Sequence, residues 1–502
     1  MSGIFSNITA ISYALQTQSK AVEQAGKNLS NLNNPNYARQ RVIMGSDGTT
    51  VGQFGPQAGP PIVLGVEHVR DQFIDRQILS EVSYTASLET EQSRLRQVLA
   101  TLGETVDRIN DPKFISDSME NNGALRSQME AFFNAFEAFS ASPGDANARQ
   151  VVYQAAENMV NGFNRLDDRL RQFENSLVEE IDRAVVDLND RLRNLSSQSG
   201  EIANLEVGAG GQANDLRDTR LQNLEGISEK LLYEIEDLPE GGGLISLSVR
   251  DTSGNRVELV RGGEPARQIR FDEANGTFSV VGQDETLDLQ VGELASLARV
   301  KDSYLDNVRQ DLDRLANTVA TSVNELYYRA FQPAGVDPAI PESSFFQDPT
   351  PPPSITGTPS TVTAGSIALY TGSTDPLVTE SLPLSPENLR SSGASATGTN
   401  GVALAIASLG TESMAELDGL RFSEFSIRTT VSLGGEIRNL ENRLAVQEDV
   451  ESVLRERRSE VSGVSLDEEV TNMVQYQRAF QASSRVFNVL SEMLDTIVNG
   501  LR

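Results

Sequence analysis

The chain has 502 residues, a formal net charge of −29, no cysteine, no tryptophan and one histidine, His68. The absence of cysteine excludes disulfides, thiolate metal sites and cysteine nucleophiles, and one histidine excludes any site that needs two imidazoles. The acidity argues against nucleic acid as a partner, because such a protein needs a basic face to displace counterions. No segment approaches the roughly 18 consecutive apolar residues of a membrane-spanning helix, and no secretory signal is evident, so we expect no membrane partner.

The first segment has the pattern of a narrow coiled-coil helix. Its apolar residues recur mostly at steps of three and four, with Gln18 inside the one seven-residue gap. The run NLSNLNNPN that starts at Asn28 is turn-forming, so we expect the helix to end there. The residues that we expect to pack in this seam are Ile4, Ile8, Ile11, Leu15, Val22 and Leu29.

The next part of the chain predicts irregular structure and then long helices. Residues 45–65 hold Gly, Pro and short apolar patches, which predicts a loop or irregular strands. Helical patterns follow from about 66 to 106, from 123 to 139 and from 146 to 207. The last of these, at ~60 residues, would span roughly 90 Å, which suits a rod better than a compact domain. His68 lies at the start of the first helical pattern, where we expect a surface position.

The spacing of the apolar residues along the chain then changes twice. From 239 to about 292, apolar and polar residues alternate between turns, which predicts a small antiparallel β unit. A helical pattern returns from about 294 to 331. Residues 331–400 hold 11 of the chain's 19 prolines and are rich in Ser and Thr, so we expect loops and short strands there.

The C-terminal end repeats the heptad pattern of the N-terminal end. After a helical pattern that strengthens from 425 to 461, the last helix starts at Ser465, which has capping-box spacing to Glu468. Its stripe alternates steps of four and three, and polar residues interrupt it. We expect the two terminal helices to pack in a larger array, because one narrow-seamed hairpin buries little. The residues expected in this seam are Leu466, Val470, Met473, Phe480, Phe487, Leu494 and Val498.

A search for catalytic motifs finds none. No phosphate-binding loop, nucleophile elbow or calcium loop is present. Acidic pairs such as Asp167–Asp168 and Glu468–Glu469 lie on predicted helices, where adjacent side chains point about 100° apart, so we expect solvated faces. We therefore expect no catalytic residue, no metal site and no cofactor.

Motifs at both ends resemble those of a known family. NLSNLNNPNYAR at 28–39 resembles the Asn-rich motif of bacterial flagellar axial proteins, the rod, hook and hook-associated subunits. SGVSLDEEV at 462–470 and QRAFQASSRVF at 477–487 resemble their C-terminal motif. Middle segments at 65–77, 125–136 and 213–220 are similar to those of hook-associated members of this family. The residues that carry the N-terminal turn motif are Asn28, Asn31, Pro35, Asn36, Tyr37 and Arg39.

One departure from the motif has a structural expectation. Asn36 stands where the family usually has Gly, and Asn is the residue next best suited to positive φ, so we expect a tight left-handed turn there.

The resemblance implies a structural role in the bacterial flagellum. It implies a subunit of the junction ring between hook and filament, whose terminal helices pack into the axial core. The implied partners are the hook protein, the second hook–filament junction protein, copies of the chain itself in a ring and a flagellar export chaperone. It also implies an extracellular location, reached through type III export without a cleaved signal peptide. A hook or rod-body subunit of the same family remains the alternative.

We expect a mainly α fold, with terminal coiled-coil helices, a long-helix bundle domain and a small antiparallel β domain inserted. The expected terminal coiled-coil core domain comprises 1–44 and 462–502. The expected elongated helical domain comprises 45–238, 293–330 and 401–461. The expected β-rich outer domain is 239–292, and the irregular insert is 331–400.

Overall fold

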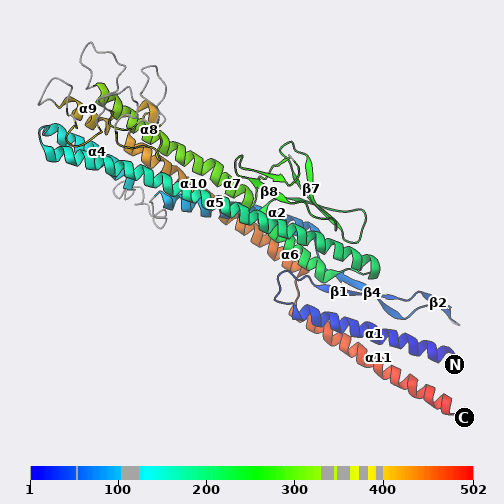
Figure 1. Cartoon of the computed structure of the whole chain (residues 1–502). Helices are drawn as coiled ribbons and strands as arrows, with labels where there is room; N and C mark the ends of the chain where they lie inside the picture. The colour runs from blue at the N-terminus through cyan, green and yellow to red at the C-terminus, as the bar shows by residue number, and fades with distance from the viewer. Residues whose placement is uncertain are drawn as a thin grey trace. The chain divides into compact units, whose positions relative to one another are not determined.

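The computed structural model describes residues 2–52, 55–102, 124–209, 211–283, 285–329, 344–347, 362–371, 383–389, 391 and 400–500. Long helices dominate it, with short antiparallel sheets between them (Figure 1), so the predicted mainly α fold is confirmed. The chain forms two compact units. Unit 1 comprises 1–88, 182–295 and 444–502, and unit 2 comprises 89–181 and 296–443.

Three long helices contribute residues to both units, namely α2 (Gln72–Thr101), α5 (Ala146–Ala209) and α10 (Phe422–Ser462). Helix α5 has 64 residues, close to the length that its sequence pattern predicts. It forms because an unbroken apolar stripe recurs at helical spacing without proline. Leu188, Leu192, Leu195 and Ile202 of this stripe are fully buried within unit 1.

The N-terminal part of unit 1 combines a helix with a long β-hairpin. Helix α1 (Ser2–Ser30) leads into strand β1 (Gln40–Ser46), which pairs antiparallel with β4 (Pro61–His68). Between them, β2 (Thr49–Gly52) pairs with β3 (Gly55–Ala58). The predicted helix start near 66 is wrong, because residues up to His68 pair with β1 and α2 begins at Gln72.

The rest of unit 1 is a second helical layer and a β unit. Helix α6 spans Asn214–Lys230, and α11 spans Leu466–Gly500. Leu454 of α10 packs on a buried cluster of Ile74, Ile78 and Val82 from α2. The two small sheets have the strand orders β5-β6-β7 and β10-β9-β8, and their strands are β5 (Glu234–Asp237), β6 (Ile245–Arg250), β7 (Arg256–Arg261), β8 (Ile269–Asp272), β9 (Thr277–Val280) and β10 (Thr286–Leu287).

Unit 2 is helical around an aromatic core. Phe132 of α4 lies with its ring centroid 5.2 Å from that of Phe136 and 5.7 Å from that of Phe345, both in tilted or edge-to-face arrangements typical of packed aromatic rings. Phe345 comes from the predicted irregular insert, most of which lies outside the described residues. The remaining elements that contribute to unit 2 are α4 (Ala124–Ala141), α7 (Glu293–Arg299), a π-helical turn (Val300–Leu305), α8 (Asp306–Arg329), α9 (Gly401–Leu409) and a 3₁₀ turn (Ala415–Leu417).

None of the described helices combines the length and hydropathy needed to cross a bilayer. The exact domain boundaries expected from the sequence stay a prediction.

Candidate assembly site at the chain ends

The two terminal helices lie side by side and antiparallel, with the two chain ends near each other (Figure 1). Helix α1 also packs on the β1–β4 hairpin. The face that it buries there combines small and polar residues: Thr17 is 2% exposed, Ala21 2% and Gln24 4%. The Thr17 hydroxyl donates to the backbone oxygen of Pro61 at 3.1 Å. One face of α1 is therefore occupied by the hairpin, and another meets α11.

The predicted seam residues are brought to this helix pair but are not buried by it. On α1, Ile8, Ile11, Leu15, Val22 and Leu29 are only partly buried. On α11, Met473, Phe487 and Leu494 are partly buried, whereas Leu466 is 48% exposed, Val470 43% and Phe480 39%. Ile4 and Val498 are not among the residues whose side chains are described. The pair thus leaves apolar surface open along its length.

Asn28 is the centre of a hydrogen-bonded cluster that we call the clasp, made of Asn28, Tyr37, Arg39, Gln40 and Glu469. Asn28 is 1% exposed. Its Oδ1 accepts hydrogen bonds from Gln40 N at 3.1 Å and Tyr37 Oη at 2.8 Å. Its Nδ2 donates to Gln40 O at 2.9 Å and to Glu469 Oε2 at 3.1 Å. Both donors and both lone pairs of the amide are therefore used.

Arg39 ties the same turn to the C-terminal helix. Its Nε donates to Glu469 Oε1 at 2.8 Å and its Nη1 to Glu468 Oε2 at 2.6 Å. Its backbone N–H donates to Ser462 O at 2.8 Å. The Glu469 carboxylate is buried, and burying a charge is tolerated when it is paired and hydrogen-bonded, as it is here by Arg39 and Asn28.

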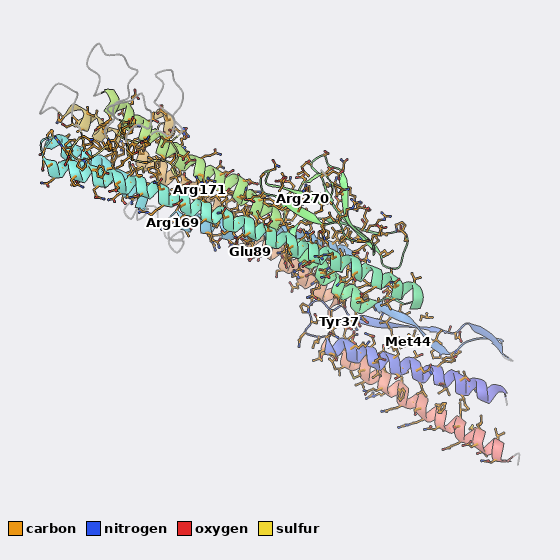
Figure 2. All side chains as sticks on the ribbon, in the orientation of Figure 1. Tyr37, Met44, Glu89, Arg169, Arg171 and Arg270 are labelled. Atoms are coloured by element: carbon orange, nitrogen blue, oxygen red, sulfur yellow. The ribbon has the colours of Figure 1, made fainter. Side chains whose placement is uncertain are left out.

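The rest of the turn motif shapes the chain between α1 and β1. Asn31 Nδ2 donates to Lys27 O at 3.0 Å, and Asn36 N donates to Asn34 Oδ1 at 3.1 Å. Pro35 is exposed. Tyr37, labelled in Figure 2, has its pKa raised by burial and then by nearby carboxylates, so the phenol stays a neutral donor to the clasp.

The expectation of a left-handed turn at Asn36 is wrong. Across the described ranges Asp418 alone among non-glycine residues has a positive φ. The turn closes instead through successive short-range backbone bonds, Asn34 N to Asn31 O at 3.0 Å and Tyr37 N to Asn34 O at 3.1 Å. Such turns need no residue with positive φ.

Two further sequence expectations are corrected here. Glu469 does not lie on a solvated face, because Arg39 reaches it from the other end of the chain. His68 is not at the surface either: its side chain is 8% exposed, with Nε2 3.1 Å from Asp218 Oδ1 of α6. His68 ends β4, opposite Gln40, and so is buried against α6.

Sequence reasoning missed Gln40 and Glu469 as members of the clasp. Gln40 follows the quoted turn motif directly, and its Nε2 donates to Asp215 Oδ1 of α6 at 3.0 Å. Glu469 lies within the quoted C-terminal motif. The signal that could have found it is the pairing of an arginine in one motif with acidic residues in the other.

The cluster has no sign of catalytic or metal chemistry. Its polar atoms are engaged with one another, so it holds backbone segments together rather than presenting free groups. Within the ranges that the structure describes, no three His, Asp or Glu side chains gather in a way that could hold a metal ion.

Comparisons with known proteins agree with both the terminal motifs and the helical middle. The model of the flagellar hook-associated protein FlgK helical domain matches residues 115–337, and that of the flagellar basal body rod FlgEFG protein C-terminal matches residues 455–500. Flagellar hook-associated protein 1 of Bacillus subtilis is 25% identical over 545 aligned positions, covering 100% of this chain and 99% of that protein. These matches confirm the predicted resemblance to a hook-associated junction protein.

Further hook-associated proteins match over shorter lengths. Hook-associated protein 1 of Salmonella typhimurium is 24% identical over 64% of this chain and 56% of its own length. The Escherichia coli protein is 25% identical over 67% of this chain and 59% of its own length. The solved flagellar hook junction protein FlgK from Burkholderia pseudomallei shares the fold, with a TM-score of 0.54 at 14% identity over 77% of this chain and 100% of that one.

These matches confirm the predicted role as a flagellar structural protein rather than an enzyme. Because the match over the full length is to a hook-associated protein, a hook or rod-body subunit is not favoured.

Proposed function

We propose that the chain is a subunit of the junction between hook and filament, incorporated by packing α1 and α11 into an axial core with neighbouring subunits. The single observation that carries this proposal is the helix pair that the clasp joins: its apolar seam stays partly exposed. Phe480, at 39% exposed, is one example. Contiguous exposed apolar surface marks a site of protein association.

The exposed residues of α11 continue around the helix beyond the predicted seam. Val486 is 50% exposed, Val489 50% and Met493 52%. A two-helix pair that leaves such residues open gains stability when further helices cover them, because burial contributes about 25 cal/mol per Å² of apolar surface. On this basis we assign residues 1–44 and 462–502 to the core domain. We further propose that 45–238, 293–330 and 401–461 form an elongated helical domain. The remaining ranges, 239–292 and 331–400, are proposed as outer parts.

The names of the relatives, hook-associated protein 1 and hook junction protein, support the hook protein as a partner. The second junction protein, copies of the chain in a ring and an export chaperone are proposed from the resemblance of the terminal motifs. We propose an extracellular position in the flagellum, reached by export without a cleaved signal. The absence of cysteine supports this, since no disulfide has to be managed between a reducing cytosol and the exterior.

The experiment replaces Phe480 by Ser in the full chain and follows it in a strain that lacks the native protein. We expect the variant to fold but to fail to incorporate at hook ends, because α11 loses an apolar contact with neighbouring helices. The matched control is Gln475→Ser on the same helix, which removes an exposed polar side chain and should leave incorporation intact.

Filaments of normal length and number from the Phe480→Ser strain would contradict the proposal. Imaging the labelled wild-type chain distinguishes a junction subunit from a hook or rod-body subunit. A junction subunit would lie at the hook tip, whereas a hook or rod-body subunit would lie along the whole hook or rod.

A further inference from the structure

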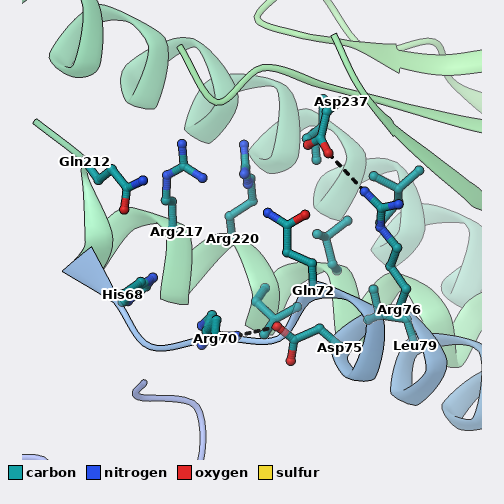
Figure 3. Close-up of a pocket in the computed structure, with 14 residues that line it drawn as sticks. His68, Arg70, Gln72, Asp75, Arg76, Leu79, Gln212, Arg217, Arg220 and Asp237 are labelled. Carbon is teal, nitrogen blue, oxygen red and sulfur yellow. Dashed lines mark hydrogen bonds and ion pairs between the residues drawn. The ribbon is translucent and has the colours of Figure 1, made fainter. Parts of the chain in front are cut away.

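A cavity of about 200 Å³ lies within unit 1, between α2, α6 and the strands β5 and β6 (Figure 3). Four arginines line it, against two aspartates. This balance is the reverse of that of the whole chain, which carries 71 acidic and 42 basic residues. The charged residues of the lining are Arg70, Arg76, Arg217, Arg220, Asp75 and Asp237.

Three of these arginines have carboxylate partners. Arg70 Nη1 donates to Asp75 Oδ2 at 3.1 Å, and Arg70 Nη2 donates to the carboxylate of Asp218 on α6. Arg217 holds both oxygens of Glu206, at 2.7 and 2.8 Å. Arg76 pairs with Asp237 at 3.0 Å, at the more exposed end of the cavity.

Arg220 differs from them. It is 8% exposed, and its only hydrogen bond within the described part of the chain goes from Nη1 to the backbone oxygen of Gly243. No carboxylate of the described residues lies within ion-pair distance of it. Burial and then the neighbouring Arg217 lower the pKa of Arg220 to about 10, against the opposing effect of the Asp237 and Glu206 carboxylates. Among the described residues, the guanidinium of Arg220 thus uses one of its five donors and has no carboxylate in direct contact.

Arg217 and Arg220 lie next to each other on α6. Figure 3 shows their guanidinium groups pointing the same way, with the Gln72 amide beside Arg220. Gly243 closes this side with a φ of +66°, a backbone conformation that favours glycine, and a Cβ there would lie 2.6 Å from Arg217 Nη2.

One more nitrogen of the lining, Arg70 Nε, is buried without a hydrogen-bond partner, whereas His68 Nε2 lies 3.1 Å from Asp218 Oδ1. Buried donors without partners are rare in folded proteins and call for water or an ion. Asp75 Oδ1 is also without a hydrogen bond, and it lies 3.8 Å from Arg458 Nη1, so the acidic groups of the cavity are themselves neutralised by arginines.

We propose that this cavity is a binding site for a single anionic group, a carboxylate or a phosphate, held chiefly by Arg220 with Arg217 and Gln72. Its volume is below the roughly 300–1,000 Å³ of pockets for larger ligands, so one such group with a few waters fits. The group comes either from a free ion or from an acidic side chain of another protein chain. The proposal does not depend on the proposed place of the chain in the flagellum.

The test uses the full-length protein and inorganic phosphate, titrated against chloride at matched ionic strength. We expect phosphate to raise the thermal unfolding midpoint of the wild type saturably, since a ligand that binds the folded state stabilises it by mass action. Arg220→Gln should weaken phosphate binding about tenfold or more, because charge-assisted hydrogen bonds are lost. The matched control is Arg193→Gln, an exposed arginine of α5 that pairs with Asp190, and it should respond like the wild type.

The general stabilising effect of phosphate on any protein acts equally on all three proteins, so only the difference between them counts. An equal response of wild type and Arg220→Gln would overturn the proposal. If Arg220→Gln does not fold, equilibrium dialysis of the wild type decides: one phosphate bound per chain supports the site, and none overturns it. Acetate in place of phosphate tests the carboxylate form.

Incorporation of Arg220→Gln at hook ends then separates the two sources. A folded variant that loses both phosphate binding and incorporation identifies an acidic side chain of a neighbouring subunit as the occupant. A variant that loses phosphate binding alone identifies a free ion.

Discussion

Arg39 and Glu469 form a hydrogen-bonded ion pair of 2.8 Å between residues that are 430 positions apart in the chain. The carboxylate is buried at the start of α11, and the guanidinium belongs to the turn that follows α1. This pair, with Asn28, fixes where the two ends of the chain meet. The position of the exposed apolar seam along both helices follows from it.

Replacing Glu469 by Gln should therefore loosen the terminal helix pair. The change leaves Arg39 with only the exposed Glu468, and we expect a loss of about 2 kcal/mol, somewhat below the cost of breaking a fully buried pair. Hydrogen exchange of the backbone amides of α1 and α11 measures it locally. Glu468→Gln is the control, since an exposed pair contributes less than about 1 kcal/mol. Equal effects of the two substitutions would show that burial of Glu469 does not matter.

Asn28→Asp tests the central residue of the clasp with a side chain of the same shape. The substitution replaces an N–H donor by an oxygen beside Glu469 Oε2 and Gln40 O, both acceptors. We expect a loss of about 2–3 kcal/mol, from two lost hydrogen bonds and a repelled carboxylate. Chemical unfolding followed by a label on the hairpin reports it. Asn31→Asp, whose amide bonds only within its own turn, should cost much less.

The aromatic core of unit 2 should be sensitive to truncation. Phe132 is fully buried, and Phe132→Ala should cost about 3–5 kcal/mol through lost contacts and a cavity. Because the chain has two compact units, we expect the calorimetric transition of unit 2 to shift. Phe73→Ala is the control: that ring is 68% exposed, and its removal should change stability by no more than about 0.5 kcal/mol.

Asp418 gives a prediction of pH dependence. Hydrogen bonds from Arg314 and then Arg428 lower the pKa of this carboxyl to about 2. Its stabilising effect is therefore present above the unfolded pKa of about 3.9 and is lost as the pH falls towards about 2.

The test compares thermal midpoints of the wild type and Asp418→Asn. Asn tolerates the positive φ of 60° at this position, so the substitution changes the charge and not the backbone. The wild type should unfold at the higher temperature near neutral pH, and the difference should shrink below about pH 4. A difference that stays constant with pH would rule out the ion pairs as its cause.

The long helices could be predicted from the sequence because their apolar residues recur at a fixed spacing, which is local information. The strand at 61–68 could not be predicted in full, because it forms by pairing with residues 40–46 and because no helix-breaking residue follows Gly65. The burial of His68 follows from the same pairing. The face of α1 that contains Thr17 and Gln24 was missed for a related reason, because only the hairpin makes this polar face an interior one.

Only part of the candidate site could be predicted from the sequence. The turn motif and the start of α11 stand out as sequences, but their contact spans almost the whole chain. Asn36 shows the limit of transferring a glycine's conformation to its substitute: the turn is built from short-range backbone bonds, and no positive φ is needed.

The hydrogen bond from Asn28 to Glu469 joins positions 441 residues apart, which has a consequence for the order of folding. A ribosome releases the chain from its N-terminus, so Asn28 has emerged long before its last partner exists. Contacts of such separation form late. The amide at the end of α1 therefore stays incompletely bonded until Glu469 has been synthesised, and the terminal pair cannot close before then.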